Sequence, residues 1–159
     1  GDEIWKYQIL LRKCEYYNNC KKGILYKILF IYNKYRFRKL GIKLGFTIPI
    51  NVFAEGLSIA HYGTIVVNET ARIGKNCRIH EGVTIGATNG NPKAAKIGDN
   101  VFIGSGAKII GDITLGDRIA IGANSVVVKS CNESNVTLAG SPARIVSKNG
   151  SRDFLIRNE

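Results

Sequence analysis

The sequence predicts an all-β fold, a solenoid of short parallel strands, preceded by a short helical segment. Two observations predict it. Aliphatic residues recur every six positions between residues 67 and 127, often followed by glycine as in Ile103-Gly104. Residues 1–46 lack this repeat; they are rich in basic and aromatic residues, and their apolar residues recur at helical spacing. A chain of 159 residues is long enough for one compact domain with such an appendage.

The first predicted unit, residues 1–46, is a basic, aromatic-rich helical segment. Most of the net charge of +11 lies there, because residues 1–47 hold 11 Lys/Arg against 3 Asp/Glu. Apolar residues recur three or four apart between residues 24 and 35, which predicts an amphipathic helix, and an earlier helix is expected over residues 3–17. The segment either caps the solenoid or attaches it to a membrane surface or nucleic acid. Nucleic acid is disfavoured because no recognised binding motif accompanies the charge.

The second predicted unit, residues 47–147, is the solenoid. In a layout by sixes from Val67, ten of the eleven first positions are aliphatic and are expected to fill the interior. The stretch "GATNGNPKAAK", residues 86–96, breaks the repeat with Gly, Asn and Pro and predicts an ejected loop. Long loops on a rigid scaffold often carry function. Residues 148–159 are expected to form a C-terminal tail.

Three strings in the chain, "HYGTIVVNET", "VFIGSGAKIIGDITLGDRIAIGANSVV" and "AGSPARIV", resemble the hexapeptide-repeat acyltransferases, in particular the serine acetyltransferases. The resemblance covers about residues 47–147. It implies a left-handed parallel β-helix with three hexapeptides per coil, a hand that the repeat itself does not reveal. It also implies acetyl-CoA as the acyl donor, no metal, and a homotrimer, because the CoA groove of that family lies between subunits.

His61 is the candidate catalytic residue. It stands where neighbouring repeats place an aliphatic residue, and the resemblance implies a general base that takes a proton from the attacking hydroxyl. Imidazole suits this task because it titrates near neutral pH. Gly86 and Ala87 are small enough to bring a backbone N–H to the oxyanion. The acceptor-site candidates are Glu69, His80 and Asn89.

The resemblance places the pantetheine arm of CoA along small residues stacked one 18-residue coil apart, such as Ser105 and Ala123. Basic residues toward the C-terminus are expected to meet the CoA phosphates. The predicted CoA-binding residues are Gly104, Ser105, Gly122, Ala123, Lys108, Lys129, Ala139, Gly140, Arg144 and Lys148.

Two departures from the serine acetyltransferases bear on the acceptor. Ala60 stands where that family has an Asp before the catalytic histidine, and Lys93 and Ala94 stand where it has an Arg-His pair. These absences favour a saccharide acceptor, in a capsule, O-antigen or related surface glycan precursor. The alternative is a serine O-acetyltransferase of cysteine biosynthesis. An alternative of another class is a non-catalytic β-helix scaffold, held to membrane or nucleic acid by the basic N-terminal segment.

The remaining sequence features exclude or disfavour several other classes of protein. A γ-type carbonic anhydrase needs three histidine ligands for its zinc, and the chain has two histidines. The four cysteines form no CxxC pair, which favours reduced thiols. A cytoplasmic location is expected because no segment resembles a signal peptide or membrane span, and peripheral attachment to the inner face of the membrane stays open.

Overall fold

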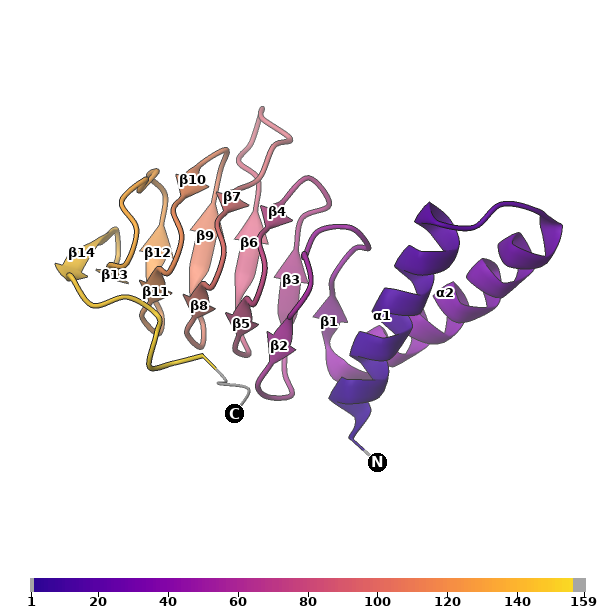
Figure 1. The fold of residues 1–159 in the computed structure, drawn as a ribbon. Helices are drawn as coiled ribbons and strands as arrows, with labels where there is room; N and C mark the ends of the chain where they lie inside the picture. Colours follow the sequence, from indigo (N-terminus) through magenta and orange to yellow (C-terminus); the bar gives the residue numbers. More distant parts are fainter. Residues whose placement is uncertain (1, 156–159) are drawn as a thin grey trace.

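The structure of the protein is a computed structural model that describes residues 2–155. Two helices, α1 (Glu3–Asn19) and α2 (Ile24–Leu44), precede a stack of short strands wound into a β-helix (Figure 1). The predicted parallel β-helix is therefore confirmed, whereas the label all-β is too narrow. The helices take up 17 and 21 residues, and together they form a hairpin beside the first coil (Figure 1).

The strands form three sheets, and each central coil, from β4 to β12, contributes one strand to each sheet. Sheet A contains β1 (Phe46–Thr47), β3 (Ile65–Val67), β6 (Thr84–Gly86), β9 (Lys108–Ile110) and β12 (Val126–Val127). Sheet B contains β4 (Arg72–Ile73), β7 (Lys96–Ile97) and β10 (Thr114–Leu115). Sheet C contains β2 (Ser58–Ile59), β5 (Arg78–Ile79), β8 (Phe102–Ile103), β11 (Ala120–Ile121), β13 (Thr137–Gly140) and β14 (Ala143–Ser147). The β13–β14 pair is antiparallel and the other pairs are parallel.

The six-residue beat produces vertical columns of buried aliphatic side chains. In sheet C, Ile79 pairs with Ile103 and Ile103 pairs with Ile121, and all three side chains are completely buried. Burying a side chain of this size contributes about 1.5–3 kcal/mol each to folding. The columns therefore hold the coils in register, and the turns between sheets are free to carry polar residues.

Two interruptions of the beat leave the interior intact. Ile79 pairs with Ile103, which is 24 residues further on, because the loop of residues 86–96 adds six residues to its coil. This loop protrudes beyond the other turns (Figure 1). The second interruption lies between β2 and β3, where Ile59 pairs with Ile79 at a spacing of 20 residues, so the coil contains two extra residues.

The second interruption corrects the expected position of His61. The sequence layout puts this histidine in an aliphatic column, but Ile59 fills that column and is buried. His61 lies two residues beyond Ile59 in the enlarged turn before β3, and its side chain is exposed. The histidine therefore replaces no aliphatic side chain of the core.

Each end of the β-helix is covered. Tyr7, Leu11 and Cys14 of α1 are buried, and Tyr7 packs edge-on against Phe46 of β1 with ring centroids 5.2 Å apart. Arg12 of α1 donates a hydrogen bond to the carbonyl oxygen of Phe53, at 2.9 Å. At the opposite end, the β13–β14 hairpin extends sheet C (Figure 1). These contacts satisfy edges that would otherwise be left unpaired.

Candidate active site

The turns that join sheet C to sheet A, together with the end of β13, form one continuous corner along the β-helix. We call it the C–A corner; it comprises residues 60–64, 80–83, 104–107, 122–125 and 139–140. Backbone hydrogen bonds align its turns: the N–H of His80 donates to Ile103 (3.0 Å) and that of Gly104 donates to Ile121 (2.8 Å). The register therefore stacks the predicted His61, Ser105 and Ala123 in one column, although they are far apart in the sequence.

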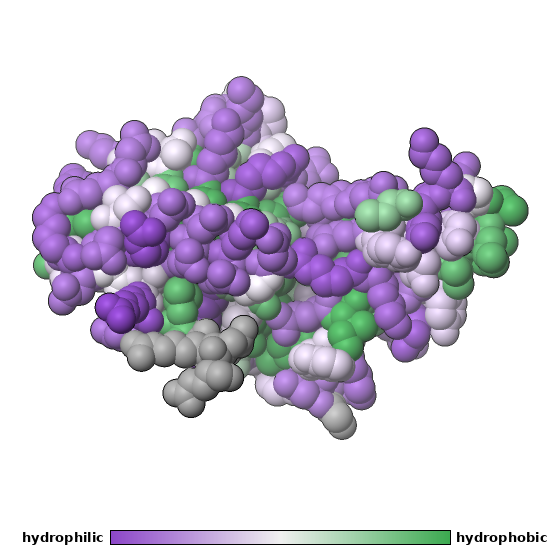
Figure 2. All heavy atoms as spheres, in the orientation of Figure 1, coloured by the Kyte–Doolittle hydropathy of each residue, from purple (hydrophilic) through white to green (hydrophobic). Residues whose placement is uncertain are grey.

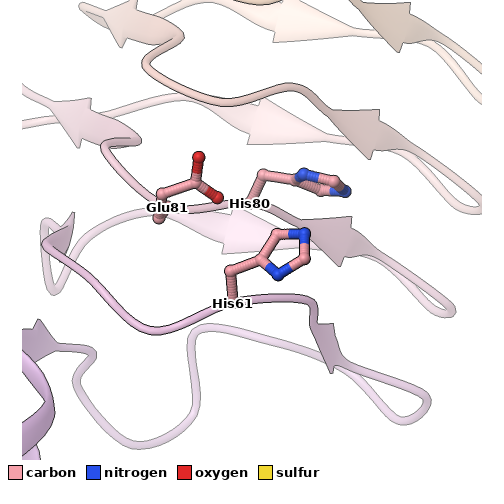
Figure 3. Close-up of side chains that lie close together, drawn as sticks. All are labelled: His61, His80 and Glu81. Atoms are coloured by element: carbon pink, nitrogen blue, oxygen red, sulfur yellow. The ribbon is translucent and has the colours of Figure 1, made fainter.

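His61 and His80 face each other at the first two turns of the C–A corner. Their ring centroids are 5.2 Å apart and their planes are inclined at 77°. Glu81 extends toward the same point (Figure 3), and nitrogen or oxygen atoms of the three side chains all lie within 4.8 Å of one another. Ser105 from the next turn completes the group, with its Oγ 3.5 Å from Nδ1 of His80. The predicted His61 and His80 are thus brought together.

Glu81 is a residue that the sequence reasoning missed. It follows His61 by 20 residues, and this number is the pairing distance between Ile59 and Ile79. An 18-residue coil would have put Ile79 at this height instead. The sequence feature that could have revealed Glu81 is the turn after Ile59, which is two residues longer than the other turns between sheets C and A. A six-residue layout that starts at Val67 does not include this turn.

The surroundings of His80 and Glu81 favour the neutral imidazole and the charged carboxylate. Burial lowers the pKa of His80, helped by the nearby cationic Arg78 and by His61, so its neutral form is favoured. The hydrogen bond from Ser105 lowers the pKa of Glu81, which stays a carboxylate at neutral pH. Two atoms of this group, Nε2 of His80 and Oε2 of Glu81, are buried without a hydrogen-bond partner in the structure.

The same three side chains offer two imidazole nitrogens and one carboxylate oxygen. This donor set suits a divalent transition metal such as zinc. Such an ion could therefore be held by His61, His80 and Glu81. Among residues 2–155, no other three His, Cys, Asp or Glu side chains have donor atoms this close together.

Beyond the two histidines, the C–A corner is lined by small residues because its coils approach closely. A Cβ on Gly104 would lie 2.8 Å from the carbonyl oxygen of Ile121 and 2.9 Å from the nitrogen of Ala123, so a larger residue would push two turns apart. A Cβ on Gly122 would lie 3.2 Å from that of Ala139. The corner is consequently a shallow strip with little side-chain bulk beside His80 and Ser105.

The other predicted acceptor and oxyanion residues lie at a different corner. Glu69 is in the turn between sheets A and B, and Gly86, Ala87 and Asn89 begin the protruding loop at that same A–B corner. The two segments are tied together, since Thr70 Oγ1 donates to the carbonyl oxygen of Pro92 at 3.0 Å. Along a strand rising about 3.3 Å per residue, Glu81 and Ala87 are roughly 15–20 Å apart. One chain does not bring these four residues to His61.

The predicted cations are also divided. Arg144 is exposed on β14 and pairs with Ala139, which puts it at the end of the C–A corner. The Nζ of Lys108 donates to Gly82 and to Thr84 and lies beside the corner. Lys148 forms an ion pair with Glu133, near the turn between sheets B and C, so it is not available at the C–A corner. Lys129 is exposed just after β12, on the A–B side.

The stacked hexapeptides, with small residues along one corner, resemble the fold of the hexapeptide-repeat transferases. In agreement, residues 94–129 match the family described as bacterial transferase hexapeptide (six repeats). The expected resemblance to the hexapeptide-repeat acyltransferases of the serine acetyltransferase type is confirmed by individual relatives.

Those relatives are serine acetyltransferases. The chain is 46% identical over 99 residues to the serine acetyltransferase of Staphylococcus xylosus, covering 60% of this chain and 45% of that protein. It superimposes on the crystal structure of serine acetyltransferase from Brucella abortus strain S19 with a TM-score of 0.75 and 32% identity, covering 93% of this chain and 58% of the other. A serine acetyltransferase solved in complex with CoA gives a TM-score of 0.70 at 29% identity, covering 92% and 58%. The chain thus spans about half the length of the relatives it matches.

These relatives show that the expected saccharide acceptor is wrong. That expectation gave decisive weight to two local departures, Ala60 and the missing loop histidine, against a match over 99 residues. The relatives and structural neighbours are serine acetyltransferases, which supports the alternative acceptor. Their solved folds also imply the left-handed winding and the N-terminal helices.

Proposed function

We propose that the protein is an acetyl-CoA-dependent O-acetyltransferase that transfers an acetyl group to the hydroxyl of serine. The observation that carries the proposal is the C–A corner, where an exposed histidine adjoins a strip of small residues suited to an extended thioester substrate. Similarity to serine acetyltransferases, one of them solved with CoA, supports both the donor and the acceptor.

In the proposed reaction, His61 acts as the general base. Its neutral imidazole takes the proton of the serine hydroxyl as the hydroxyl oxygen attacks the thioester carbonyl carbon. The tetrahedral intermediate then expels the CoA sulfur, which recovers the proton from the imidazolium, leaving O-acetylserine and free CoA. Such base catalysis contributes typically about 10²–10⁴-fold. Because the acetyl group moves directly from donor to acceptor, no covalent enzyme intermediate is required.

We place the pantetheine arm along Gly104, Ser105, Gly122, Ala123 and Gly140. The close approach of the coils at Gly104 supports this, since an amide-rich chain there meets backbone groups without side-chain obstruction. Arg144, exposed at the end of the strip, is the cation we assign to the CoA phosphates.

A homotrimer would unite the two corners. Gly86, Ala87, Glu69 and Asn89 lie across sheet A from His61, so they can serve the same site only if the A–B corner of one chain faces the C–A corner of another. We therefore propose a trimer with three such sites. Sedimentation at micromolar concentration should give three times the monomer mass of 17.4 kDa, and a monomer that still acetylates serine would refute shared sites.

The acceptor is tested by following CoA thiol release from acetyl-CoA with L-serine, beside L-alanine as the matched acceptor without a hydroxyl group. We expect release that depends on serine, and O-acetylserine detected by mass spectrometry. Equal release with the two amino acids, or none, would overturn the proposed acceptor.

A second proposal concerns the outer face of α2, an apolar stripe unlike the rest of the surface. Ile24 and Ile42 are 75% and 74% exposed, and Figure 2 shows hydrophobic residues at the tip of the helical hairpin. Spacings of three, four and seven residues put the stripe on one side of the helix, opposite the buried Phe37 and Leu44. The stripe consists of Ile24, Leu25, Ile28, Ile31, Tyr32, Tyr35 and Ile42.

The charges of α2 suggest which partner covers this stripe. The helix contains no Asp or Glu, and it holds Lys27, Lys34, Arg36, Arg38, Lys39 and Lys43. A second copy of the helix would bring like charges together, whereas an anionic lipid surface accepts both the apolar side chains and the cations beside them. No helix within residues 2–155 has the length and hydropathy to cross a bilayer. We therefore propose that α2 lies in the plane of an anionic membrane surface, on the cytoplasmic side.

Vesicle flotation tests this proposal. The protein should float with phosphatidylglycerol-containing vesicles and not with pure phosphatidylcholine, and Ile31→Glu should weaken the binding. Val146→Glu is the matched control, because Val146 is also exposed (62%) but lies on β14, far from α2 in the fold (Figure 1). Equal flotation of Ile31→Glu and the parent would refute the assignment, as would α2-dependent self-association without vesicle binding.

A further inference from the structure

Ala60, the residue before His61, has no polar side-chain group that could orient the imidazole. A general base of this kind works best when a second group fixes its tautomer and stabilises its protonated form. The methyl group of Ala60 does neither, although it occupies the position where the similar enzymes carry an Asp. The exposed ring of His61 therefore needs its partner from elsewhere in the fold.

Glu81 is built into the turn that carries His61. The side chain of Glu81 passes directly beneath Gly63, where an added Cβ would come within 3.0 Å of the Cβ of Glu81. Gly63 has a φ of +131°, which favours glycine, and the N–H of Gly82 donates to the carbonyl oxygen of Thr64 at 2.7 Å. The two turns are thus locked together, and the stem of the glutamate is held in place.

The two oxygens of Glu81 differ in their surroundings. Ser105 donates a hydrogen bond to the carboxylate, whereas Oε2 is buried and accepts none. A buried acceptor without a hydrogen bond is unfavourable, and more so when it is charged. A nearby donor that can move should therefore be drawn to this oxygen.

His61 is the donor within reach. Its ring nitrogen lies within 4.8 Å of a carboxylate oxygen of Glu81, and its side chain is exposed and can rotate. A rotation that shortens the separation to about 2.9 Å makes a charge-assisted hydrogen bond. His80 offers a competing acceptor in Nε2, but a neutral imidazole cannot offset the charge of a protonated His61. The cation Arg78 lowers the pKa of the neighbouring His80, whereas the carboxylate of Glu81 raises it.

We infer that Glu81, from the following coil, is the positioning residue of His61: it accepts a hydrogen bond from one ring nitrogen and leaves the other to act as the base. The inference rests on the proposed function. It assigns to a residue 20 positions along the chain the role that Ala60 cannot fill. Glu81 touches neither serine nor acetyl-CoA, and it acts through the imidazole.

The test compares Glu81→Gln, Glu81→Asp and the parent, with Glu55→Gln as the matched control. Glu55 is an exposed glutamate paired with Lys75 in the turn between sheets B and C. For Glu81→Gln we expect kcat to fall roughly 10- to 100-fold with an unchanged KM for acetyl-CoA. Glu81→Asp should recover part of the rate.

Nitrogen NMR of the His61 ring supplies a readout that does not depend on turnover. We expect a single dominant tautomer in the parent and in Glu55→Gln, and a mixture in Glu81→Gln. An unchanged His61 tautomer in Glu81→Gln would overturn the inference, even if the variant were less stable. Failure of the parent to acetylate serine, with the tautomer shift intact, would instead overturn the proposed acceptor and leave the pairing of His61 with Glu81 standing.

Discussion

Replacing His61 by Ala should abolish most of the catalysis while leaving the fold untouched. His61 lies in an exposed turn and Ile59 fills the adjacent interior position, so the substitution should change the free energy of unfolding by less than about 0.5 kcal/mol. Loss of the general base should lower kcat by roughly 10²–10⁴-fold, which corresponds to about 2.7–5.5 kcal/mol in the activation barrier. The substitution should therefore lower kcat strongly while leaving the free energy of unfolding almost unchanged.

Two comparison variants make this separation measurable. Ile79→Ala removes a fully buried side chain between Ile59 and Ile103, which should cost about 2–5 kcal/mol and lower Tm by roughly 4–20 °C. His80→Ala should reduce kcat much less than His61→Ala if His80 lines the acceptor site.

The assay is CoA thiol release with L-serine at saturating acetyl-CoA, beside thermal unfolding of each variant. His61→Ala should match the parent in Tm and in CoA affinity. A His61→Ala variant that keeps near-parental kcat would show that the histidine is not the base and would refute the mechanism. A large fall in its Tm would refute the argument that the enlarged turn is independent of the core.

Three further predictions follow from the same geometry. Ala123→Trp should abolish CoA binding in calorimetry while Lys75→Trp, at an exposed site in the turn between sheets B and C, should not; equal affinities would show that the arm lies elsewhere. Because its surroundings lower the pKa of His80, the unfolded chain binds this proton more readily, so stability present above about pH 6.5 is lost as the pH falls below it. His80→Asn should therefore lose less Tm than the parent between pH 7.5 and 5, and an equal loss would count against this assignment. Burial raises the pKa of Cys77 to about 12 and that of Cys14 to about 11, so a thiol reagent should label the exposed Cys20 first and spare these two until unfolding.

The sequence by itself determined the repeating architecture of this protein. An aliphatic residue at every sixth position forces one buried side chain per short strand, and pairs 18 residues apart, such as Ile103 with Ile121 and Ile97 with Leu115, follow from it without further information. The loop of residues 86–96 was readable as well, because Gly, Asn and Pro replace the expected aliphatic residue. The columns of small residues, Ser105 over Ala123, followed from the 18-residue coil length.

Only the tertiary structure decided which polar residues meet. Two extra residues after Ile59 move His61 out of the interior and align it with Glu81, a shift that a strict six-residue count cannot register. The structure also separates Gly86 and Ala87 from His61, because a strand of sheet A stands between their corners. Interior positions keep the period because they must pack, whereas turn residues lose it wherever a turn gains residues. Which of them become neighbours depends on how many residues each turn holds, and that is fixed by the pairing of the strands on either side.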